Sequence, residues 1–418
     1  MYTTHILNNG IRVILSKLDA YRSTSIGLWI KTGSIDETEA NNGISHFIEH
    51  MLFKGSSKRS ARDIAEAFDS IGGDLNAFTS KECTCFHAKV LDRHVDIAID
   101  IIADMISDPL MDAEDIKLEK SVVLDEIMMA EDTPDDVSYD LISKVIYHEG
   151  TLSRPILGTK ESLELIDKQI IQKHLDDYYT TDNLVISIAG SFDKVAILEL
   201  LNQHFRMSKT HHKNHESKNY FHSDTAFVYR DIEQVHLEIG YEGISDSSDQ
   251  IFNLAALNNI LGASVSSRLF QNIRESKGLT YSINSYLTQY ENNGLFSIYA
   301  SMHVSNLKLV CELIKMELDI LLKNGIEEKE FLRVKEQLKG NHILDLEGTD
   351  SYMNLIGKGH LFNKKIRTPD EVETLINNLK KSEIEVLMFK ILSSKPSIAL
   401  VGRVDQKLLD DCTSIIGG

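Results

Sequence analysis

Two histidines and a glutamate stand close together in the segment 43–53, which reads GISHFIEHMLF. If this segment is helical, His46 and His50 lie one turn apart on the same face, because four residues separate them. Two imidazoles placed in this way can bind one zinc ion, at metal–nitrogen distances of about 2.0–2.1 Å. Glu49 lies beside the second histidine, where a carboxylate can accept a proton from water without being a ligand itself. The pattern His-x-x-Glu-His therefore predicts a zinc site with a general base.

The residues around this pattern strengthen the metal interpretation. Alone, two histidines and a glutamate can be ordinary polar positions of an amphipathic helix. Here the neighbouring positions are strongly apolar: Ile44, Phe47, Ile48, Met51 and Leu52. Ionisable side chains in such a helix are costly to bury unless something pairs with them, and a metal ion is such a partner.

A third metal ligand is expected from another helix, because catalytic zinc usually has three protein ligands and one open position. The helix predicted over residues 112–131 carries five acidic candidates: Glu114, Glu119, Asp125, Glu126 and Glu131. Glu119 and Glu126 are seven residues apart and so lie on nearly the same face, among apolar neighbours. One or both are therefore expected near the metal. Without the histidine pair, solvated helix carboxylates would be the better interpretation.

Length and composition indicate a globular protein of two or more domains. The chain has 418 residues, which is too many for one ordinary core. No run approaches the roughly 18 apolar residues of a membrane span, and no secretory signal is visible at the N-terminus. The four cysteines are too few for a disulfide framework: Cys83, Cys85, Cys311 and Cys412. We expect reduced thiols and a cytoplasmic location.

The net charge of −19 disfavours nucleic acid and anionic membranes as partners. An acidic enzyme would attract basic peptides. Solubility alone is the simpler explanation of the charge, and we favour it.

The second half of the chain repeats the first. Three pairs of matching positions are separated by 262 − 55 = 207, 284 − 76 = 208 and 402 − 190 = 212 residues: Gly55 and Gly262, Asn76 and Asn284, Gly190 and Gly402. A shift of 207 places Asn253, Ala256 and Leu257 opposite the two histidines and the glutamate. The second half therefore copies the fold and lacks the metal site.

The duplication predicts a catalytic domain at 1–207 and a homologous, metal-free domain at 224–418. The linker between them, 208–223, breaks all periodicity. Three of its histidines are expected to be solvated rather than metal-binding: His211, His212 and His215.

With these residues identified, the chain resembles the pitrilysin, insulysin and mitochondrial processing peptidase family of inverzincins, and most of all its single-chain bacterial processing proteases. The resemblance assigns the third zinc ligand to Glu126, which stands 126 − 50 = 76 residues after His50. Glu119 matches a second family glutamate that supports the site. The implied fold is α+β, with two homologous domains that form a clamshell, each a mostly antiparallel β-sheet packed with α-helices.

Two further stretches carry the resemblance. The stretch 72–84, GGDLNAFTSKECT, matches the family's active-site edge strand, in which Asn76 and Ala77 would bind the substrate backbone by strand addition. The stretch 274–281, RESKGLTY, resembles the Arg/Tyr element of the protease-active members. There Arg274 and Tyr281 would reach from the metal-free domain toward the scissile carbonyl and stabilise the developing oxyanion.

The resemblance implies a Zn²⁺-dependent endopeptidase that hydrolyses peptides, or processes leader segments, inside an enclosed chamber. The substrate would be a peptide or an unfolded polypeptide. Because the family's chamber takes four such domains, two copies are expected to pair as a homodimer. The alternative is a non-catalytic scaffold or substrate-binding subunit. Such relatives have typically lost zinc ligands, whereas this chain retains each of them, and its natural substrate is not indicated by the sequence.

Overall fold

The structure, a computed structural model, describes residues 2–208 and 218–417. The described chain forms two compact units, each with one β-sheet and its own hydrophobic core. The first unit comprises residues 2–128, 154–208 and 344–368, and the second comprises residues 129–153, 218–343 and 369–417. Most of the predicted linker, including His211, His212 and His215, lies outside the described residues.

The first unit contains a six-stranded sheet in the order β1-β2-β6-β3-β5-β4. The strands are β1 Tyr2–Ile6, β2 Arg12–Lys17, β3 Ser23–Ile30, β4 Asp74–Thr79, β5 Thr84–Leu91 and β6 Leu184–Gly190. Neighbouring strands are antiparallel except β2 and β6, which are parallel. Strand β4 lies at one edge, so one row of its main-chain groups faces no other strand of the described sheet.

Helices build the core on one face of this sheet. They are α1 Ile44–Leu52, α2 Ala61–Ile71, α3 Val95–Ser107, α4 Ala113–Asp132, α6 Lys160–Leu165, α7 Lys168–Tyr178 and α8 Lys194–His204. The sequence predicts helical structure over residues 160–179, and the structure divides this stretch into two helices, α6 and α7. A new helix begins after Asp167, because this residue is the N-cap of α7. Its carboxylate accepts hydrogen bonds from the N–H groups of Gln169 and Ile170, both at 2.9 Å.

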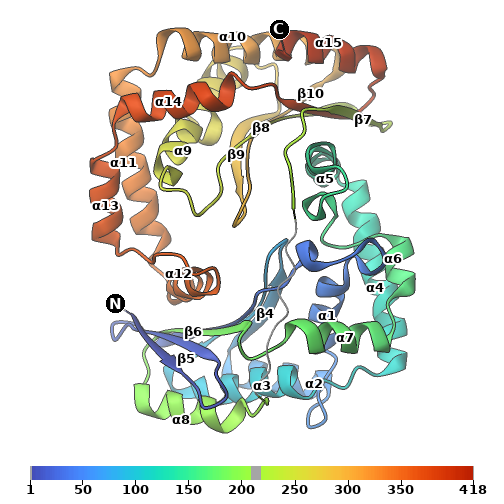
Figure 1. Ribbon diagram of the computed structural model, residues 1–418, viewed down its shortest axis with the longest axis vertical. Helices are drawn as coiled ribbons and strands as arrows, with labels where there is room; N and C mark the ends of the chain where they lie inside the picture. Colours follow the sequence, from blue (N-terminus) through green and yellow to red (C-terminus); the bar gives the residue numbers. More distant parts are fainter. Residues whose placement is uncertain (1, 209–217, 418) are drawn as a thin grey trace. The chain divides into compact units, whose positions relative to one another are not determined.

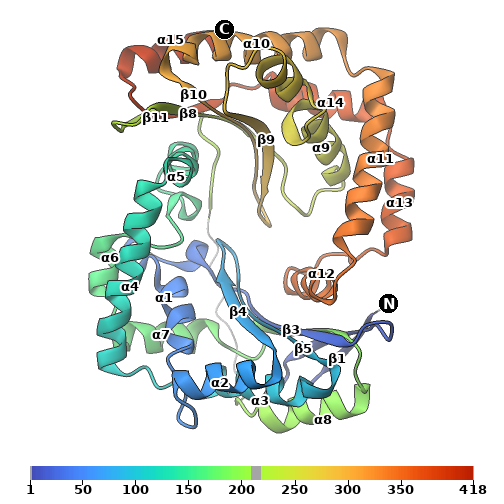
Figure 2. The same cartoon turned by 180° about the vertical axis from the view of Figure 1, so that it is seen from behind.

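The opposite face of the same sheet is covered by a helix from the second half of the chain, α12 Thr349–Leu361 (Figures 1 and 2). Gly357 lies so close to the sheet that an added Cβ would be 2.1 Å from Nε1 of Trp29. The Trp29 indole N–H donates to Ser187 Oγ at 2.8 Å, and the hydroxyls of Ser25 and Thr349 are also 2.8 Å apart. Segment 344–368 therefore belongs to the first unit.

The second unit contains a five-stranded sheet in the order β7-β11-β8-β10-β9. The strands are β7 Thr225–Tyr229, β8 Gln234–Glu242, β9 Ser282–Gln289, β10 Gly294–His303 and β11 Ser397–Gly402. The helices of this half are α9 Ile251–Asn258, α10 Leu307–Asn324, α11 Glu328–Asp345, α13 Pro369–Asn377, α14 Lys381–Leu392 and α15 Gln406–Gly417. Helix α5, Pro134–Tyr147, comes from the first half and packs on the face of the sheet opposite α10 and α15 (Figures 1 and 2).

The two sheets confirm the duplication. Strands β2-β6-β3-β5-β4 and β7-β11-β8-β10-β9 have the same order, and the single parallel pair, β2 with β6 or β7 with β11, lies at the same place in each. Gly190 and Gly402 end the equivalent strands with φ of 139° and 138°. The predicted α+β fold of two homologous domains is therefore confirmed. The compact units differ from the predicted contiguous halves, because α5 and α12 each pack on the other half's sheet.

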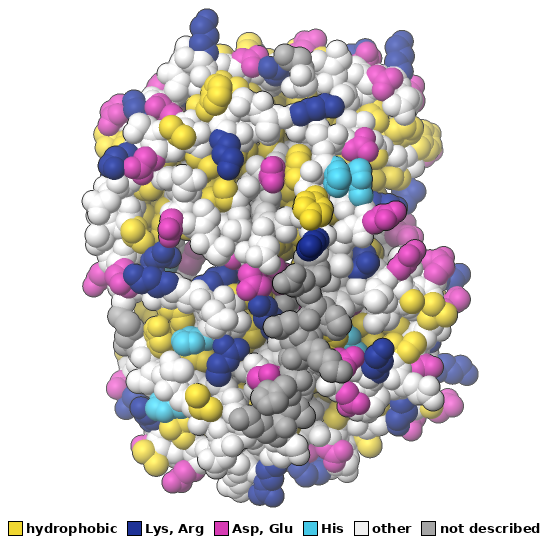
Figure 3. Space-filling view, viewed as in Figure 1, with side chains coloured by type: hydrophobic (Ala, Val, Ile, Leu, Met, Phe, Trp, Pro, Cys, Tyr) yellow, Lys and Arg dark blue, Asp and Glu magenta, His cyan; other side chains and the backbone are white. Residues whose placement is uncertain are grey.

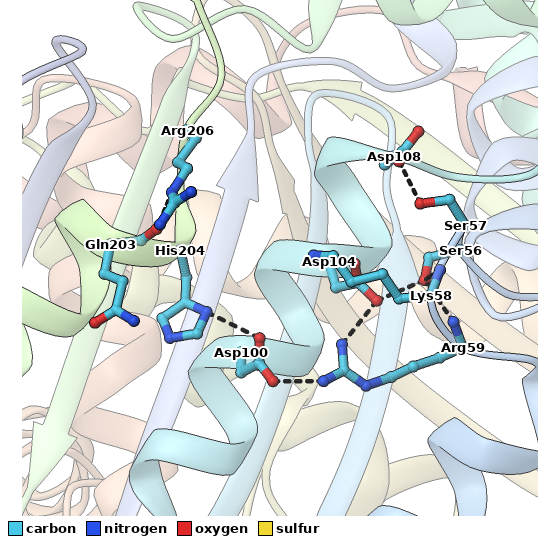
Figure 4. A network of polar contacts seen from close by, with 10 residues as sticks. All are labelled: Ser56, Ser57, Lys58, Arg59, Asp100, Asp104, Asp108, Gln203, His204 and Arg206. Carbon is cyan, nitrogen blue, oxygen red and sulfur yellow. Dashed lines mark hydrogen bonds and ion pairs between the residues drawn. The ribbon is translucent and has the colours of Figure 1, made fainter.

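A polar network anchors the loop that follows α1 (Figure 4). Asp104 on α3 accepts hydrogen bonds from Ser56 at 2.5 Å and from Arg59 at 2.8 Å, and lies 3.0 Å from Nζ of Lys58. Arg59 also pairs with Asp100, which in turn lies 2.8 Å from Nδ1 of His204. The loop between α1 and α2 is thereby fixed against α3.

Surface charge and the cysteines agree with a globular chain. On the face shown in Figure 3, basic and acidic side chains are interspersed rather than gathered by sign. All four cysteines are buried and free. Among the described residues no helix combines the length and apolarity that a membrane span requires.

Candidate metal centre

Helix α1 presents the histidine pair and has a specialised N-terminus. Gly43 precedes the helix with a φ of 90°, and a Cβ at this position would be 2.6 Å from the carbonyl oxygen of Leu157, so glycine is required. The carboxylate of Glu37 accepts hydrogen bonds from the N–H groups of Gly43 at 2.6 Å and Ser45 at 2.9 Å. A carboxylate at this position accepts hydrogen bonds from N–H groups that have no partner within the helix. Its negative charge also interacts favourably with the positive end of the helix dipole. Burial raises the pKa of Glu37, although the hydrogen bonds from Ser45 and Gly43 act in the opposite direction.

The predicted ligands come together. Nε2 of His46 lies 3.2 Å from Nε2 of His50, and Oε2 of Glu126 lies 3.6 Å and 3.5 Å from these two atoms. A tetrahedral zinc site with metal–ligand distances of about 2.0–2.2 Å separates its donor atoms by roughly 3.3–3.6 Å. The three atoms therefore fit zinc. In the part of the chain that the structure describes, they form the single group with metal-ligand spacing.

The apolar residues that surround the motif in the sequence are all fully buried: Ile44, Phe47, Ile48, Met51 and Leu52. The histidines and Glu49 therefore lie in a helix that is otherwise largely buried, as the sequence indicates. Burial, followed by the nearby His50, lowers the pKa of His46 to about 4. His46 is therefore neutral near pH 7, and a neutral imidazole is the form that binds a metal.

Glu119 supports the site from behind. Its Oε1 lies 2.8 Å from Nδ1 of His50, and its Oε2 pairs with Nζ of Lys54 just after α1. Only 4% of the Glu119 side chain is exposed, compared with 38% of Glu126. A carboxylate on Nδ1 fixes the proton there and leaves Nε2 free to bind a metal. Lys54 has no signal in the sequence that would connect it with Glu119.

Glu49 lies beside the ligands and is joined to the edge strand. The hydroxyl of Thr79, the last residue of β4, donates to Oε2 of Glu49 at 2.5 Å. Burial raises the pKa of Glu49 and Glu126 adds to this, while the hydrogen bond from Thr79 and the proximity of His50 lower it. The net shift is upward, which is common for carboxylates that transfer protons.

Asn76 and Ala77 lie on the exposed edge strand, as predicted. Ser80 N–H donates to the carbonyl oxygen of Cys83 at 2.8 Å where β4 and β5 meet. Because paired groups alternate in an antiparallel ladder, the main-chain groups of Leu75, Ala77 and Thr79 face the outer edge. The amide oxygen of Asn76 accepts the N–H of Ala77 at 2.8 Å.

Arg274 and Tyr281 lie in the second unit. Arg274 is exposed, with its guanidinium 4.9 Å from the centre of the Phe270 ring. Tyr281 is 74% exposed, and its N–H donates to the carbonyl oxygen of Ser301 at 2.8 Å. Their role at the metal centre stays a prediction.

The equivalent helix of the second half, α9, carries no metal-binding side chains at the matching positions. Asn253, Ala256 and Leu257 are all buried there. Among the described residues, the candidate metal centre is thus confined to one copy of the duplicated fold.

Comparison with known proteins assigns the family. Residues 12–160 match the family described as Insulinase (Peptidase family M16), and residues 166–338 match the Peptidase M16 inactive domain. A protein of Bacillus subtilis named uncharacterized zinc protease YmxG is 41% identical over 96% of this chain and 98% of its own length. The chain belongs to peptidase family M16. The metal centre lies in the stretch that matches the insulinase description, and Arg274 and Tyr281 lie in the stretch that matches the inactive domain.

Other relatives of this M16 chain agree in sequence or in fold. The uncharacterized zinc protease SCO5738 of Streptomyces coelicolor is 33% identical over 96% of this chain and 89% of its own length. The crystal structure of a protease from Helicobacter pylori has a TM-score of 0.90 at 20% identity, and covers 96% of this chain and 99% of its own. A chain of complex III2 from Candida albicans has a TM-score of 0.86 at 18% identity over 99% of both chains. The two structures share the fold.

Proposed function

We propose that this M16 protein is a zinc-dependent endopeptidase that binds peptides or unfolded polypeptide segments along β4 and hydrolyses them. The observation that carries the proposal is the group of Nε2 of His46, Nε2 of His50 and Oε2 of Glu126, whose separations of 3.2–3.6 Å suit one zinc ion. The names of its relatives as zinc proteases support the same metal.

The residues around these atoms have separate tasks. When bound, zinc would polarise the scissile carbonyl and increase the acidity of water. Glu49 would accept the proton of the attacking water and later donate it to the leaving amine. Because Thr79 occupies Oε2 of Glu49, we assign this proton transfer to Oε1. Glu119 would hold the His50 ring with Nε2 directed at the metal.

The substrate would lie as an added strand against β4. The outward carbonyl oxygen of Ala77 and the outward main-chain groups of Leu75 and Thr79 can pair with a peptide backbone, which gives affinity with broad sequence tolerance. Asn76 would help to hold that backbone, and Arg274 and Tyr281 would stabilise the oxyanion. The further proposals are a homodimer that encloses the substrate and a cytoplasmic location, which the free cysteines favour.

A scaffold or substrate-binding subunit is the alternative function. The likeness to a chain of complex III2 does not favour this alternative, because at 18% identity it concerns the fold alone. The retained ligand set and general base favour the peptidase.

The deciding experiment measures zinc by elemental analysis and peptide cleavage with internally quenched peptides on the purified full chain. We expect about one zinc per chain, cleavage that a chelator abolishes, and recovery when zinc is restored. Glu49→Gln is the matched variant, because it keeps the ligands and removes the base. It should retain zinc and lose about 10²–10⁴-fold in turnover. A chain that binds zinc and cleaves none of a broad peptide mixture would favour the scaffold.

A further inference from the structure

A groove lies between helix α2 and the start of the edge strand β4, within the first unit. Figure 2 shows that these two elements are neighbours. Its volume is about 350 Å³, and its walls are mainly apolar. It is lined by Ile64 and Phe68 of α2, which are buried, and by Leu75 of β4 and Phe53 after α1. Apolar surface that is open to solvent beside a binding edge is typical of a ligand pocket.

The groove opens on the face of the sheet that carries the metal centre. Leu75, Ala77 and Thr79 share one face of β4, because side chains alternate along a strand. Thr79 contacts Glu49, whereas Leu75 borders the groove four residues away (79 − 75 = 4). At about 3.4 Å per residue, the groove lies roughly 13–14 Å along the strand from Thr79.

A peptide strand paired with β4 would direct one side chain into this groove. Residues directly opposite each other in a sheet place their side chains on the same face. The peptide residue opposite Leu75 would therefore point to the groove, two positions farther from the metal than the residue opposite Ala77. This position depends only on the face and the spacing of the side chains, so it is the same for either direction of the peptide.

On the basis of the proposed peptidase function, we propose that the groove is a specificity pocket for one large apolar side chain of the substrate, Leu, Met or Phe, at the position opposite Leu75. Burial of such a side chain against Ile64 and Phe68 would favour peptides that carry it. Asp69 and Asp74 are exposed residues that also line the groove, and their charges would disfavour an acidic side chain at the same position.

The shape of the groove depends on a small residue of α2. Ala65 is exposed, lies one turn from both Ala61 and Phe68 and lines the groove. A phenylalanine at this position would occupy the groove without replacing a core residue. Ser70, on the same helix, is also exposed and does not line the groove, so Ser70→Phe is a matched control.

The test uses quenched peptides of one sequence in which leucine or alanine is placed at each position in turn. For the zinc-loaded wild type we expect one sensitive position, which lies two residues beyond the peptide residue opposite Ala77. At this position the leucine peptide should have a kcat/KM about 10- to 200-fold higher than that of the alanine peptide. In Ala65→Phe this ratio should fall to about 1, and in Ser70→Phe it should stay as in the wild type. A ratio that Ala65→Phe leaves unchanged would overturn the pocket. A preference for Lys or Arg at that position, in place of Leu, would overturn it as well.

Binding separates this inference from the peptidase activity. The same peptide pair is titrated against Glu49→Gln by fluorescence anisotropy, with and without Ala65→Phe. One outcome is that the Leu peptide binds preferentially, that Ala65→Phe removes this preference, and that the wild type cleaves neither peptide. This outcome would support the pocket and contradict the peptidase. Cleavage with no leucine preference in either assay would support the peptidase and contradict the pocket.

Discussion

Nδ1 of His50 lies 2.8 Å from Oε1 of Glu119, a carboxylate whose side chain is almost fully buried on α4. Seven residues later on the same helix, Oε2 of Glu126 lies 3.5 Å from the other nitrogen of the same ring. The imidazole therefore stands between two glutamates of one helix. The buried glutamate orients the ring, and the more exposed one is available to a metal.

The two glutamates should differ in their effect on zinc affinity. Glu119→Gln keeps the three donor atoms and weakens the support of His50, so zinc should bind about 10- to 100-fold more weakly. Glu126→Ala removes a donor atom and should weaken zinc binding by more than Glu119→Gln does. Competition titrations with a zinc chelator measure both affinities. Full zinc affinity in Glu126→Ala would move the third ligand elsewhere, with Glu119 the first candidate.

The packing of α12 on the sheet of the first unit can be tested through Trp29, the single tryptophan of the chain. Gly357→Ala places a Cβ 2.1 Å from Nε1 and 2.6 Å from Ser187 Oγ, so α12 must move away from the sheet. We expect a loss of about 1–3 kcal/mol in the free energy of unfolding. Tryptophan emission should shift to longer wavelength as the indole becomes accessible.

Gly340→Ala on α11 is the matched control, because an added Cβ there meets no atom within 4 Å. It should leave the emission unchanged and stabilise the protein by up to about 1 kcal/mol through helix propensity. Equal effects of the two substitutions would contradict the packing of α12 on this sheet.

Much of the secondary structure could be predicted because its signals are local. The sequence predicts a helix over residues 61–71 and strands over residues 184–190 and 397–402. Helix α2 and strands β6 and β11 have these bounds, since periodicity and terminal glycines mark their ends. The packing of α5 and α12, each on the sheet formed by the other half of the chain, could not be predicted in this way. An amphipathic pattern shows that a helix has a buried face, and it does not show which sheet covers that face.

In the candidate metal centre, too, the residues set by local spacing could be predicted, and those brought close by the fold could not. His46, Glu49 and His50 could be predicted because one helical turn sets their geometry. Spacing alone does not distinguish Glu119 from Glu126 as the third ligand, and only the family resemblance separates them. Glu37, Lys54 and Thr79 were missed, since each makes its contact with a residue brought close by the fold. Alternation along β4 places Thr79 on the face of Ala77, which was the one available signal for it.

Tyr281→Phe tests whether the metal-free half contributes to catalysis. If the hydroxyl donates to the oxyanion mainly in the transition state, kcat should fall by about 10- to 10³-fold with little change in KM. Zinc content should stay the same. Tyr229→Phe in the same unit is the control, because Tyr229 is also an exposed tyrosine, at 61%. Unchanged kcat in Tyr281→Phe would remove Tyr281 from the site.

Asp104 should make stability depend on pH in the acid range. Burial raises the pKa of this carboxyl, but hydrogen bonds from Ser56, Lys58 and Arg59 outweigh it, and the pKa lies below its ordinary value. A carboxyl whose pKa is lower in the folded state stabilises the protein above its unfolded pKa of about 3.9. That contribution is lost as the pH falls through the lower, folded pKa.

Asp104→Asn should therefore reduce the free energy of unfolding by about 3 kcal/mol at pH 7, the low end of the cost of breaking a buried ion pair. The difference from the wild type should shrink below about pH 4, where the unfolded carboxyl becomes protonated. Urea titrations of both proteins from pH 3 to pH 8 measure it. Asp96→Asn, at an exposed position in the first turn of the same helix, should cost at most about 1 kcal/mol. A difference between Asp104→Asn and the wild type that grows toward low pH would contradict the lowered pKa, and with it the role of this carboxylate in holding the loop after α1.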